Sequence, residues 1–153
     1  MTRVTFTIPG TPYAKKRHRV ASIGGRARAF NPAGNERFEN VVRQIAAPHF
    51  PEPITGPVRV EIIAVFEPPQ SWSKRKRAEL MHAPHCQKPD GDNVLKAALD
   101  GLNRIAFADD AQIAAMSVRK AWGPVAQTIV AVEPLTSAGM LRMTEIEIRG
   151  VVA

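Results

Sequence analysis

Cysteine is nearly absent from this sequence, since Cys86 is the only one in 153 residues. A single thiol cannot form an intramolecular disulfide, and the N-terminus lacks the apolar run of a signal peptide. No stretch approaches the roughly 20 consecutive apolar residues that span a bilayer. We therefore expect a cytoplasmic protein with no membrane partner.

Acidic residues are also scarce: 14 Asp and Glu stand against 21 Lys and Arg, giving a net charge of +7 and a pI near 10.2. No acidic residue precedes Glu36, whereas the same stretch is rich in cations, and a second basic run spans residues 74–77. Cations that neutralise phosphates release condensed counterions, so the charge favours a polyanionic partner. The alternative is a pair of solvated loops that keep the protein soluble. The candidate DNA-binding residues are Lys15, Lys16, Arg17, Arg19, Lys74, Arg75, Lys76, Arg77 and Lys88.

The composition argues against disorder and against several domains. With 44% hydrophobic and 23% charged residues, the chain is ordinary for a globular protein. Its length suits one domain over residues 1–153. Thirteen prolines, several of them between residues 48 and 69, exclude a long helix from the middle of the chain.

Alternating and helical patterns of apolar residues predict an α+β fold, in which a small mixed sheet packs against two or three helices. Residues 10–34 lack periodicity and should form a long loop or a loosely ordered hairpin. The predicted strands lie near residues 3–8, 58–66, 111–121, 127–133 and 144–151. The first predicted helix has Asn31 as its cap and ends near Pro48. A second, short and basic, begins at Ser71 or Ser73 and ends near Met81. The third begins at Asn93 and breaks around residues 103–105.

Two short acidic clusters stand out in this basic chain. One is Asp90-Gly91-Asp92 and the other is Asp109-Asp110. Carboxylates gathered in this way repel one another unless a cation lies between them. Carboxylate oxygens suit Mg²⁺ or Mn²⁺, and the lack of a second cysteine argues against a thiolate zinc site. The clusters therefore predict a site for a hard divalent cation.

The helix that follows the first cluster would align its polar side chains in one stripe. At 100° per residue, Asp92, Lys96, Asp100 and Asn103 fall within about 80° of one another on the helix surface. The positive end of the helix also favours an anion such as phosphate. A cationic surface beside a metal-binding acidic site is more typical of a nuclease than of a DNA-binding protein without catalysis.

The acidic residues and the nearby histidines and cysteine also have alternative roles to weigh. Asp-x-Asp before a helix is often only a cap and a turn residue. An EF-hand fails because its required glycine and glutamate are missing, and a sugar-nucleotide transferase needs a longer chain. His82, His85 and Cys86 make a poor zinc cluster because no fourth ligand follows. A contact from His85 to phosphate or to a loop carbonyl is the better hypothesis.

The segment from Lys88 to Leu102, KPDGDNVLKAALDGL, with FADDAQ at residues 107–112, resembles the signature of the RusA family of Holliday junction resolvases. In that family an Asp-x-Asp-Asn-x-x-Lys stretch leads a helix, and an Asp-Asp-x-Gln stretch follows. Gly91 stands where the family often has a bulkier apolar residue, which predicts a looser turn. The resemblance implies a small α+β endonuclease that binds branched DNA as a homodimer.

Carried over position by position, the resemblance implies that Asp90, Asp92 and Asp110 hold Mg²⁺, with Mn²⁺ as a substitute, and are catalytic. Lys96 would stabilise charge on the scissile phosphate or orient the attacking water. Asp109, Asp100 and His85 would contact these residues and not the metal itself. Alternatively, Asp100 pairs with Lys96 along the helix. Trp72 and Trp122 are expected in the core or an interface, whereas Tyr13 and Phe30 are candidates for wedging into an opened junction.

The prediction is a Mg²⁺-dependent endodeoxyribonuclease that resolves Holliday junctions by paired symmetric nicks in recombination and repair, with no other small-molecule cofactor. A C₂ dimer supplies two nicks in strands related by a two-fold axis. The alternatives are a less selective flap or fork nuclease, and a branched-DNA-binding protein without catalysis, which would need none of the three aspartates.

Overall fold

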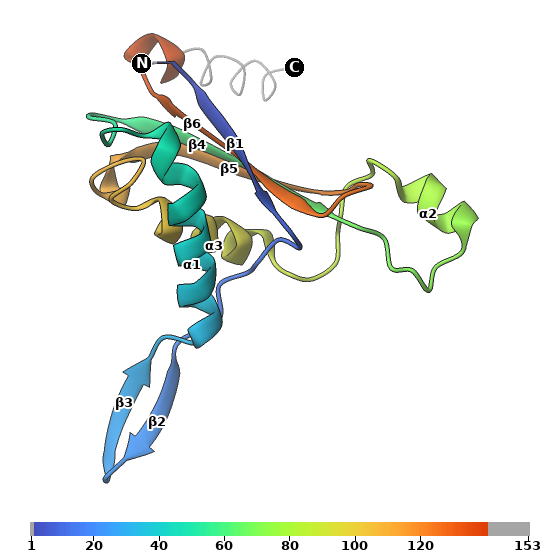
Figure 1. Cartoon of the computed structure of the whole chain (residues 1–153), viewed down its shortest axis with the longest axis horizontal. Helices are drawn as coiled ribbons and strands as arrows, with labels where there is room; N and C mark the ends of the chain where they lie inside the picture. The colour runs from blue at the N-terminus through green and yellow to red at the C-terminus, as the bar shows by residue number, and fades with distance from the viewer. Residues whose placement is uncertain (1, 141–153) are drawn as a thin grey trace, which may run out of the picture.

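Four strands form the central sheet in the computed structural model, which describes residues 2–140 (Figure 1). The strands β1 (Val4–Pro9), β6 (Gln127–Pro134), β4 (Val58–Phe66) and β5 (Ile113–Trp122) lie side by side in that order. The β1–β6 and β6–β4 pairs are antiparallel, whereas β4 and β5 are parallel. The sheet is therefore mixed, with β1 and β5 at its edges.

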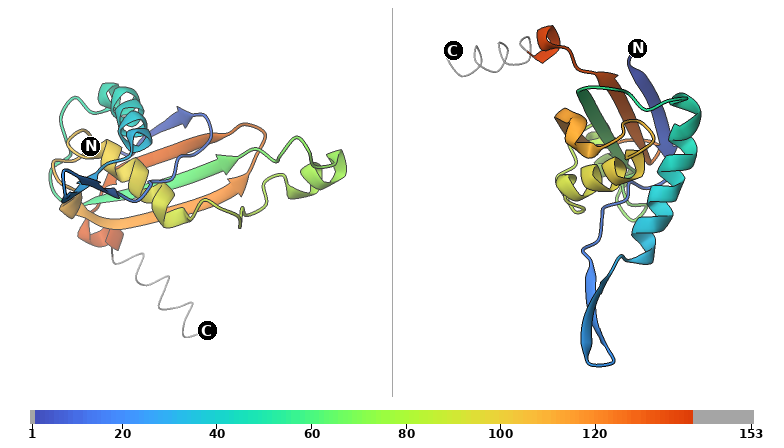
Figure 2. Two further views of the ribbon diagram at one scale, coloured as in Figure 1. Left: turned by 90° about the horizontal axis from the view of Figure 1, so that it is seen from below. Right: turned by 90° about the vertical axis from the view of Figure 1, so that its left-hand side faces the viewer.

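One face of the sheet carries the hydrophobic core because the strands alternate. Along β4, every second residue from Val58 to Phe66 is buried, and the side chains between them are half-buried. The helices α1 (Ala33–Ala46) and α3 (Gly91–Leu102) cover the core face and pack against each other (Figures 1 and 2). Gly101 permits this close contact, because a Cβ at that position would lie 2.5 Å from Val42 Cβ.

The chain between β1 and α1 forms a two-stranded hairpin that projects from the body of the molecule beyond the start of α1 (Figures 1 and 2). Its strands β2 (Arg19–Ile23) and β3 (Arg26–Phe30) are antiparallel. Gly24 and Gly25 form the two-residue turn with φ values of 59° and 74°, the left-handed values that a tight hairpin turn requires. Every residue of β3 is exposed.

A second projection carries α2 (Lys74–Leu80) (Figure 1). Ser73 caps this helix, because its Oγ accepts a hydrogen bond from Lys76 N at 3.1 Å. After α2 the chain returns along β5, where His82 N donates to Trp122 O at 3.0 Å and Trp122 N donates to Ala83 O at 2.9 Å. This return leads into the loop that precedes α3.

The predicted α+β class is confirmed, and residues 19–30 of the segment predicted as a loop or hairpin form the hairpin. Two predicted helix starts are wrong. The helix α1 begins at Ala33, so Pro32 is its N-cap residue, and the Asn31 side chain accepts a hydrogen bond from Asn35 Nδ2 at 2.7 Å without capping the helix. The helix α3 begins at Gly91, two residues before the predicted start. The strand predicted at residues 144–151 lies outside the described residues.

Two short 3₁₀ turns complete the described part of the chain, η1 (Ala47–His49) after α1 and η2 (Asp110–Gln112) before β5. Within residues 2–140, none of the helices has both the length and the apolar character needed to cross a membrane.

Candidate active site

Asp90 and Asp92 flank the first residue of α3, and both side chains are exposed. Asp90 is the N-cap residue, yet its carboxylate makes no capping hydrogen bond. Lys120 of β5 holds the preceding loop instead, because its Nζ donates to Gln87 O and to Pro89 O, both at 2.6 Å. An N-cap aspartate ordinarily accepts a backbone N–H. A carboxylate that does not cap its helix is available to a ligand.

The second acidic cluster lies at η2, where Asp109 and Asp110 differ in what they do. Asp109 Oδ1 accepts from Ala111 N at 2.8 Å, and Asp109 N donates to Gln112 Oε1 at 3.1 Å, which makes a capping box. Gln112 Nε2 also donates to Ile54 O and Gly56 O, so this turn is tied to the neighbouring loop. Asp110 is exposed, and among the described residues no hydrogen bond or ion pair engages its carboxylate.

The two acidic clusters lie apart along β5 within one chain. A Cβ on Gly91 would lie 3.4 Å from Val118 Cγ1 and 3.6 Å from Lys120 Cδ, so the start of α3 lies beside the second half of β5. Asp110 lies three residues before Ile113, where β5 begins, and Ile113 is about 16 Å from Val118 and about 23 Å from Lys120 at the usual rise of a strand. Accordingly, no group of three or more His, Cys, Asp or Glu side chains in residues 2–140 is placed to hold a metal ion.

A cationic pocket lies against the first half of α3. Its volume is about 220 Å³, and its lining consists of Lys15, Lys16, Arg17, His18, Asn93 and Lys96. Lys15 N donates to Asn93 O at 2.9 Å, and Lys15 Nζ forms an ion pair with Asp100. No carboxylate lines this pocket, so its charge suits a phosphate group. Lys96 stands one helical turn after Asp92 on the same face and connects the pocket to the first acidic cluster.

Asp100 has a partner other than the one considered from the sequence. Its ion pair is with Lys15, on the segment before the hairpin, rather than with Lys96 on its own helix. The pair fixes the basic segment along α3, so Asp100 positions the cationic pocket.

Asn35 is a structural residue of the pocket that sequence patterns did not single out. Its side chain is buried, with 2% exposed. Its Oδ1 accepts from Tyr13 Oη at 2.8 Å and from Lys16 N at 2.9 Å, while its Nδ2 donates to Lys16 O at 2.9 Å and to Asn31 Oδ1. Asn35 therefore clamps both ends of the hairpin. The available signal was its position three residues before Phe38, on the buried stripe of α1.

Asn35→Ala should lower the free energy of unfolding by about 2–4 kcal/mol, because it breaks four part-buried hydrogen bonds and leaves their partner groups unpaired at about 1–3 kcal/mol each. It should also weaken DNA binding, since Lys16 is no longer held. Asn40→Ala, on the exposed side of the same helix, is the matched control and should change stability by about 0.5 kcal/mol or less. Denaturant unfolding and binding to a labelled junction measure both effects, and equal stabilities of the two variants would contradict the clamp.

The basic residues of α2 lie apart from the cationic pocket (Figure 1). Lys76 Nζ sits 3.9 Å from the centroid of the Trp72 ring, and Arg75 Nε pairs with Glu79 Oε1 at 3.0 Å. Lys88 is exposed two residues before Asp90. The structure thus gathers the first basic stretch with Lys96, but it does not bring Lys74–Arg77 to the same place.

Of the aromatic residues singled out from the sequence, some pack inside the protein and others are exposed. Tyr13 stacks on Phe38 at 5.1 Å between ring centroids and donates to Asn35, so it is part of the clamp rather than a free wedge. Phe30 is 45% exposed on β3. Trp122 is buried in the core, in edge contact with Trp72.

His85 lies in the core rather than at the surface, with 7% of the residue exposed. Its ring stacks on Phe66 at 4.1 Å and contacts Trp122 at 4.3 Å between centroids. Its Nδ1 has no hydrogen-bond partner in the described part of the chain. Burial, and then the charge of Lys120, lower the pKa of His85 from its ordinary value.

His85→Phe should flatten the dependence of stability on pH. The unfolded chain binds a proton that the folded chain excludes from His85, so the wild type should lose stability as the pH falls below about 6.5, the ordinary histidine pKa. The phenylalanine variant keeps an aromatic ring between Phe66 and Trp122 without that proton. Denaturant unfolding between pH 7.5 and 5 measures this, and an equally steep loss in the variant would contradict it.

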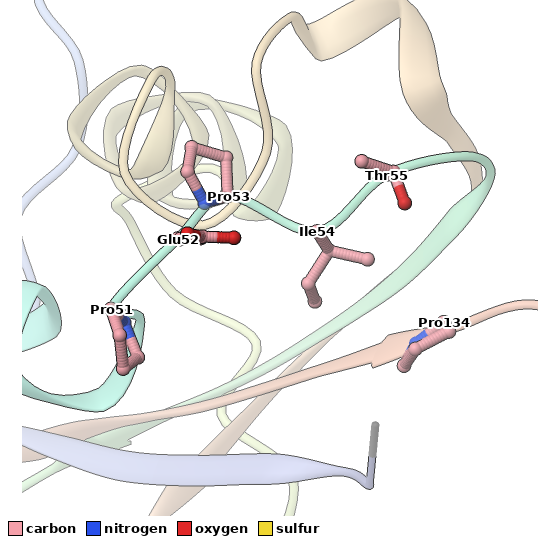
Figure 3. Close-up of a pocket in the computed structure, with 6 residues that line it drawn as sticks. All are labelled: Pro51, Glu52, Pro53, Ile54, Thr55 and Pro134. Atoms are coloured by element: carbon pink, nitrogen blue, oxygen red, sulfur yellow. The ribbon is translucent and has the colours of Figure 1, made fainter.

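Two larger hollows border the loop of residues 51–56, on the side of the molecule near Asp110. One, of about 590 Å³, is lined by Pro51, Glu52, Pro53, Ile54, Thr55 and Pro134 (Figure 3). The other, of about 570 Å³, shares part of this loop and extends to Ala108 and Gln112. Glu52 is the one charged residue in either lining. Despite their size, these hollows lack the charged groups that phosphodiester chemistry requires, so we place the site at the smaller cationic pocket.

Comparison with known proteins agrees with these features. The family model described as endodeoxyribonuclease RusA matches residues 9–133, which include both acidic clusters and the cationic pocket. The protein YqaN of Bacillus subtilis (strain 168), described as uncharacterized, is 34% identical over 122 residues, which are 76% of this chain and 86% of YqaN. The chain belongs to the RusA endodeoxyribonuclease family. Membership indicates endonucleolytic cleavage of DNA, with Holliday junctions as the branched form concerned.

Proposed function

We propose that this chain is a Mg²⁺-dependent endodeoxyribonuclease that resolves Holliday junctions by paired nicks, as a homodimer of single-domain subunits, in recombination and repair. The observation that carries the proposal is the cationic pocket beside two free carboxylates at the start of α3, in a member of the RusA family. The pocket offers a place for the DNA backbone, and the carboxylates offer ligands for a cation next to it.

The proposed roles follow from these positions. Lys16 and Arg17 bind phosphates of the DNA backbone, and Lys15 positions this segment through Asp100. Lys96, one turn from Asp92, stabilises negative charge on the scissile phosphate. Asp90, Asp92 and Asp110 hold the metal. Mg²⁺ supplies charge neutralisation at the phosphate and activation of the attacking water, and the products carry 5′-phosphate and 3′-hydroxyl ends.

The donor set fits Mg²⁺ in its chemistry, because exposed carboxylates are the ligands that this cation takes. One protomer, however, brings together only Asp90 and Asp92, since these lie beside the second half of β5 whereas Asp110 lies before its first residue. A two-fold dimer that places the partner's Asp110 beside Asp90 and Asp92 completes the donor set. The same symmetry produces two equal sites, which is what paired nicking requires.

The test is cleavage of a labelled four-way junction by the wild-type protein, beside a linear duplex, a flap and a fork of related sequence, with Mg²⁺ or with EDTA. Symmetric Mg²⁺-dependent nicks in the junction, together with a dimer in sedimentation, are expected. Equal rates on flaps and forks would indicate a less selective nuclease. Tight junction binding without cleavage in Mg²⁺ or Mn²⁺ would leave a binding protein and refute the proposed function.

A further inference from the structure

The β2–β3 hairpin has two chemically different faces. Directly paired residues of an antiparallel ribbon point to the same side, and alternate residues point to opposite sides. The register pairs Arg19 with Phe30, Ala21 with Arg28 and Ile23 with Arg26, so these six side chains share one face. The other face carries the remaining pairs, Val20 with Ala29 and Ser22 with Ala27.

The first of these faces, here called the arginine face, is built for a polyanion. It holds Arg19, Arg26 and Arg28, and no hydrogen bond or ion pair to another described residue engages these three guanidinium groups. No acidic residue occurs in the first 35 positions of the chain. Arg26 and Arg28 stand about 7 Å apart along one strand. The opposite face carries no positive charge, and Ser22 is its one polar side chain.

The shape of the hairpin also suits duplex DNA. It projects from the body of the molecule as a narrow two-stranded ribbon (Figures 1 and 2), and each strand is about 16 Å long at the usual rise. The major groove of B-DNA is about 12 Å wide and admits such a ribbon. Exposed Ile23 lies near the tip of the arginine face, where an apolar contact with a thymine methyl group is available.

The position of the hairpin links it to the candidate active site. The chain enters β2 directly from Lys15, Lys16 and Arg17 of the cationic pocket, and Asn35 clamps both ends of the hairpin. DNA held in the pocket therefore continues past a ribbon whose base is held by part-buried hydrogen bonds to Asn35.

We propose that the arginine face of the β2–β3 hairpin is a second DNA-binding site, which lies in the major groove of a junction arm away from the scissile phosphate. It rests on the proposed function for its substrate, but it assigns the contact to residues outside both acidic clusters and the cationic pocket. The contact increases the affinity for the junction and takes no part in the cleavage step.

Two charge-matched controls make the assignment testable. The test variant, Arg26→Gln/Arg28→Gln, removes two positive charges from the arginine face. The first control, Ala27→Glu/Ala29→Glu, changes the net charge by the same amount on the opposite face of the same strand. Arg37→Gln/Arg43→Gln removes two exposed cations from α1. Junction binding is measured in EDTA over a range of salt concentrations, so that cleavage does not enter the result.

The arginine-face variant should bind at least about tenfold more weakly at 0.1 M salt, and its slope of log K against log salt should be shallower by about 2, the value for two lost phosphate contacts. Both controls should lose less affinity. An arginine-face variant no weaker than the α1 variant would overturn the proposal. An equal loss in the Ala27→Glu/Ala29→Glu variant would show an effect of net charge and would overturn the assignment of the face.

Two further readouts separate this proposal from its alternatives. A shift of the Arg26→Gln/Arg28→Gln variant from dimer to monomer in sedimentation would assign the ribbon to the subunit interface and overturn the DNA contact. The wild type is scored in parallel for junction cleavage in Mg²⁺. If it cleaves while the arginine-face variant binds normally, only the hairpin proposal fails; if it neither binds nor cleaves junctions, both proposals fail.

Discussion

Asp110→Asn should reduce Mg²⁺-dependent cleavage of a four-way junction by more than about 100-fold, because replacing even an outer partner of a metal ligand typically costs 10- to 100-fold. Asp109→Asn, one residue away, should keep most of the activity. Asparagine caps a helix about as well as aspartate, so the capping hydrogen bond to Ala111 N is retained. Asp92→Asn should lose as much activity as Asp110→Asn.

Single-turnover cleavage rates measure these effects, and junction binding in EDTA shows that each variant still reaches its substrate. Because Asp110 makes no hydrogen bond among the described residues, its substitution should leave the unfolding midpoint unchanged. A large loss in Asp109→Asn with full activity in Asp110→Asn would reverse their roles. Unchanged cleavage in both Asp110→Asn and Asp92→Asn would remove the metal site altogether.

The acidic clusters could be predicted from the sequence because local spacing determines their context. Asp90 and Asp92 precede a helix whose apolar residues repeat at helical intervals, and that repeat is visible without a structure. The same reasoning predicted α+β class and the bounds of β4, whose alternate residues are buried. In each case the deciding interactions are between residues close in sequence.

Features that depend on contacts distant in sequence could not be predicted in this way. Asp100 pairs with Lys15, 85 positions away in the chain, although Lys96 was the nearer candidate on the same helix. Burial between Phe66 and Trp122 lowers the pKa of His85, and sequence neighbours do not reveal that burial. Asp109 caps the turn η2, whereas the Asp110 carboxylate makes no hydrogen bond among the described residues. This difference depends on the fold of the turn, which Gln112 ties to Ile54 and Gly56.

The separation of Asp110 from Asp90 is the most consequential of these distant features. A shared motif suggested one acidic site in each chain, but α3 begins beside the second half of β5, whereas η2 lies directly before the start of β5. The sequence order of the aspartates is therefore no guide to which of them share a cation. A site that two subunits complete would also restrict cleavage to the assembled dimer.

Mixing Asp92→Asn protein with Asp110→Asn protein should restore nicking if each site takes its Asp110 from the partner. In a mixed dimer, one site then carries both substitutions and the other carries none. With random exchange of subunits, half of the dimers are mixed, so about a quarter of the wild-type number of sites should be active. A mixed dimer has one intact site, so it should nick one strand without resolving the junction.

Asp90→Asn mixed with Asp92→Asn is the matched control for this experiment. These two substitutions lie in the same cluster, so every site of every dimer carries one of them, and no nicking should return. Differently tagged copies that purify together demonstrate that exchange has taken place. If exchange is complete and the Asp92→Asn with Asp110→Asn mixture stays inactive, the three aspartates do not combine across the dimer, and the site must form within one subunit through a movement of η2 toward the start of α3.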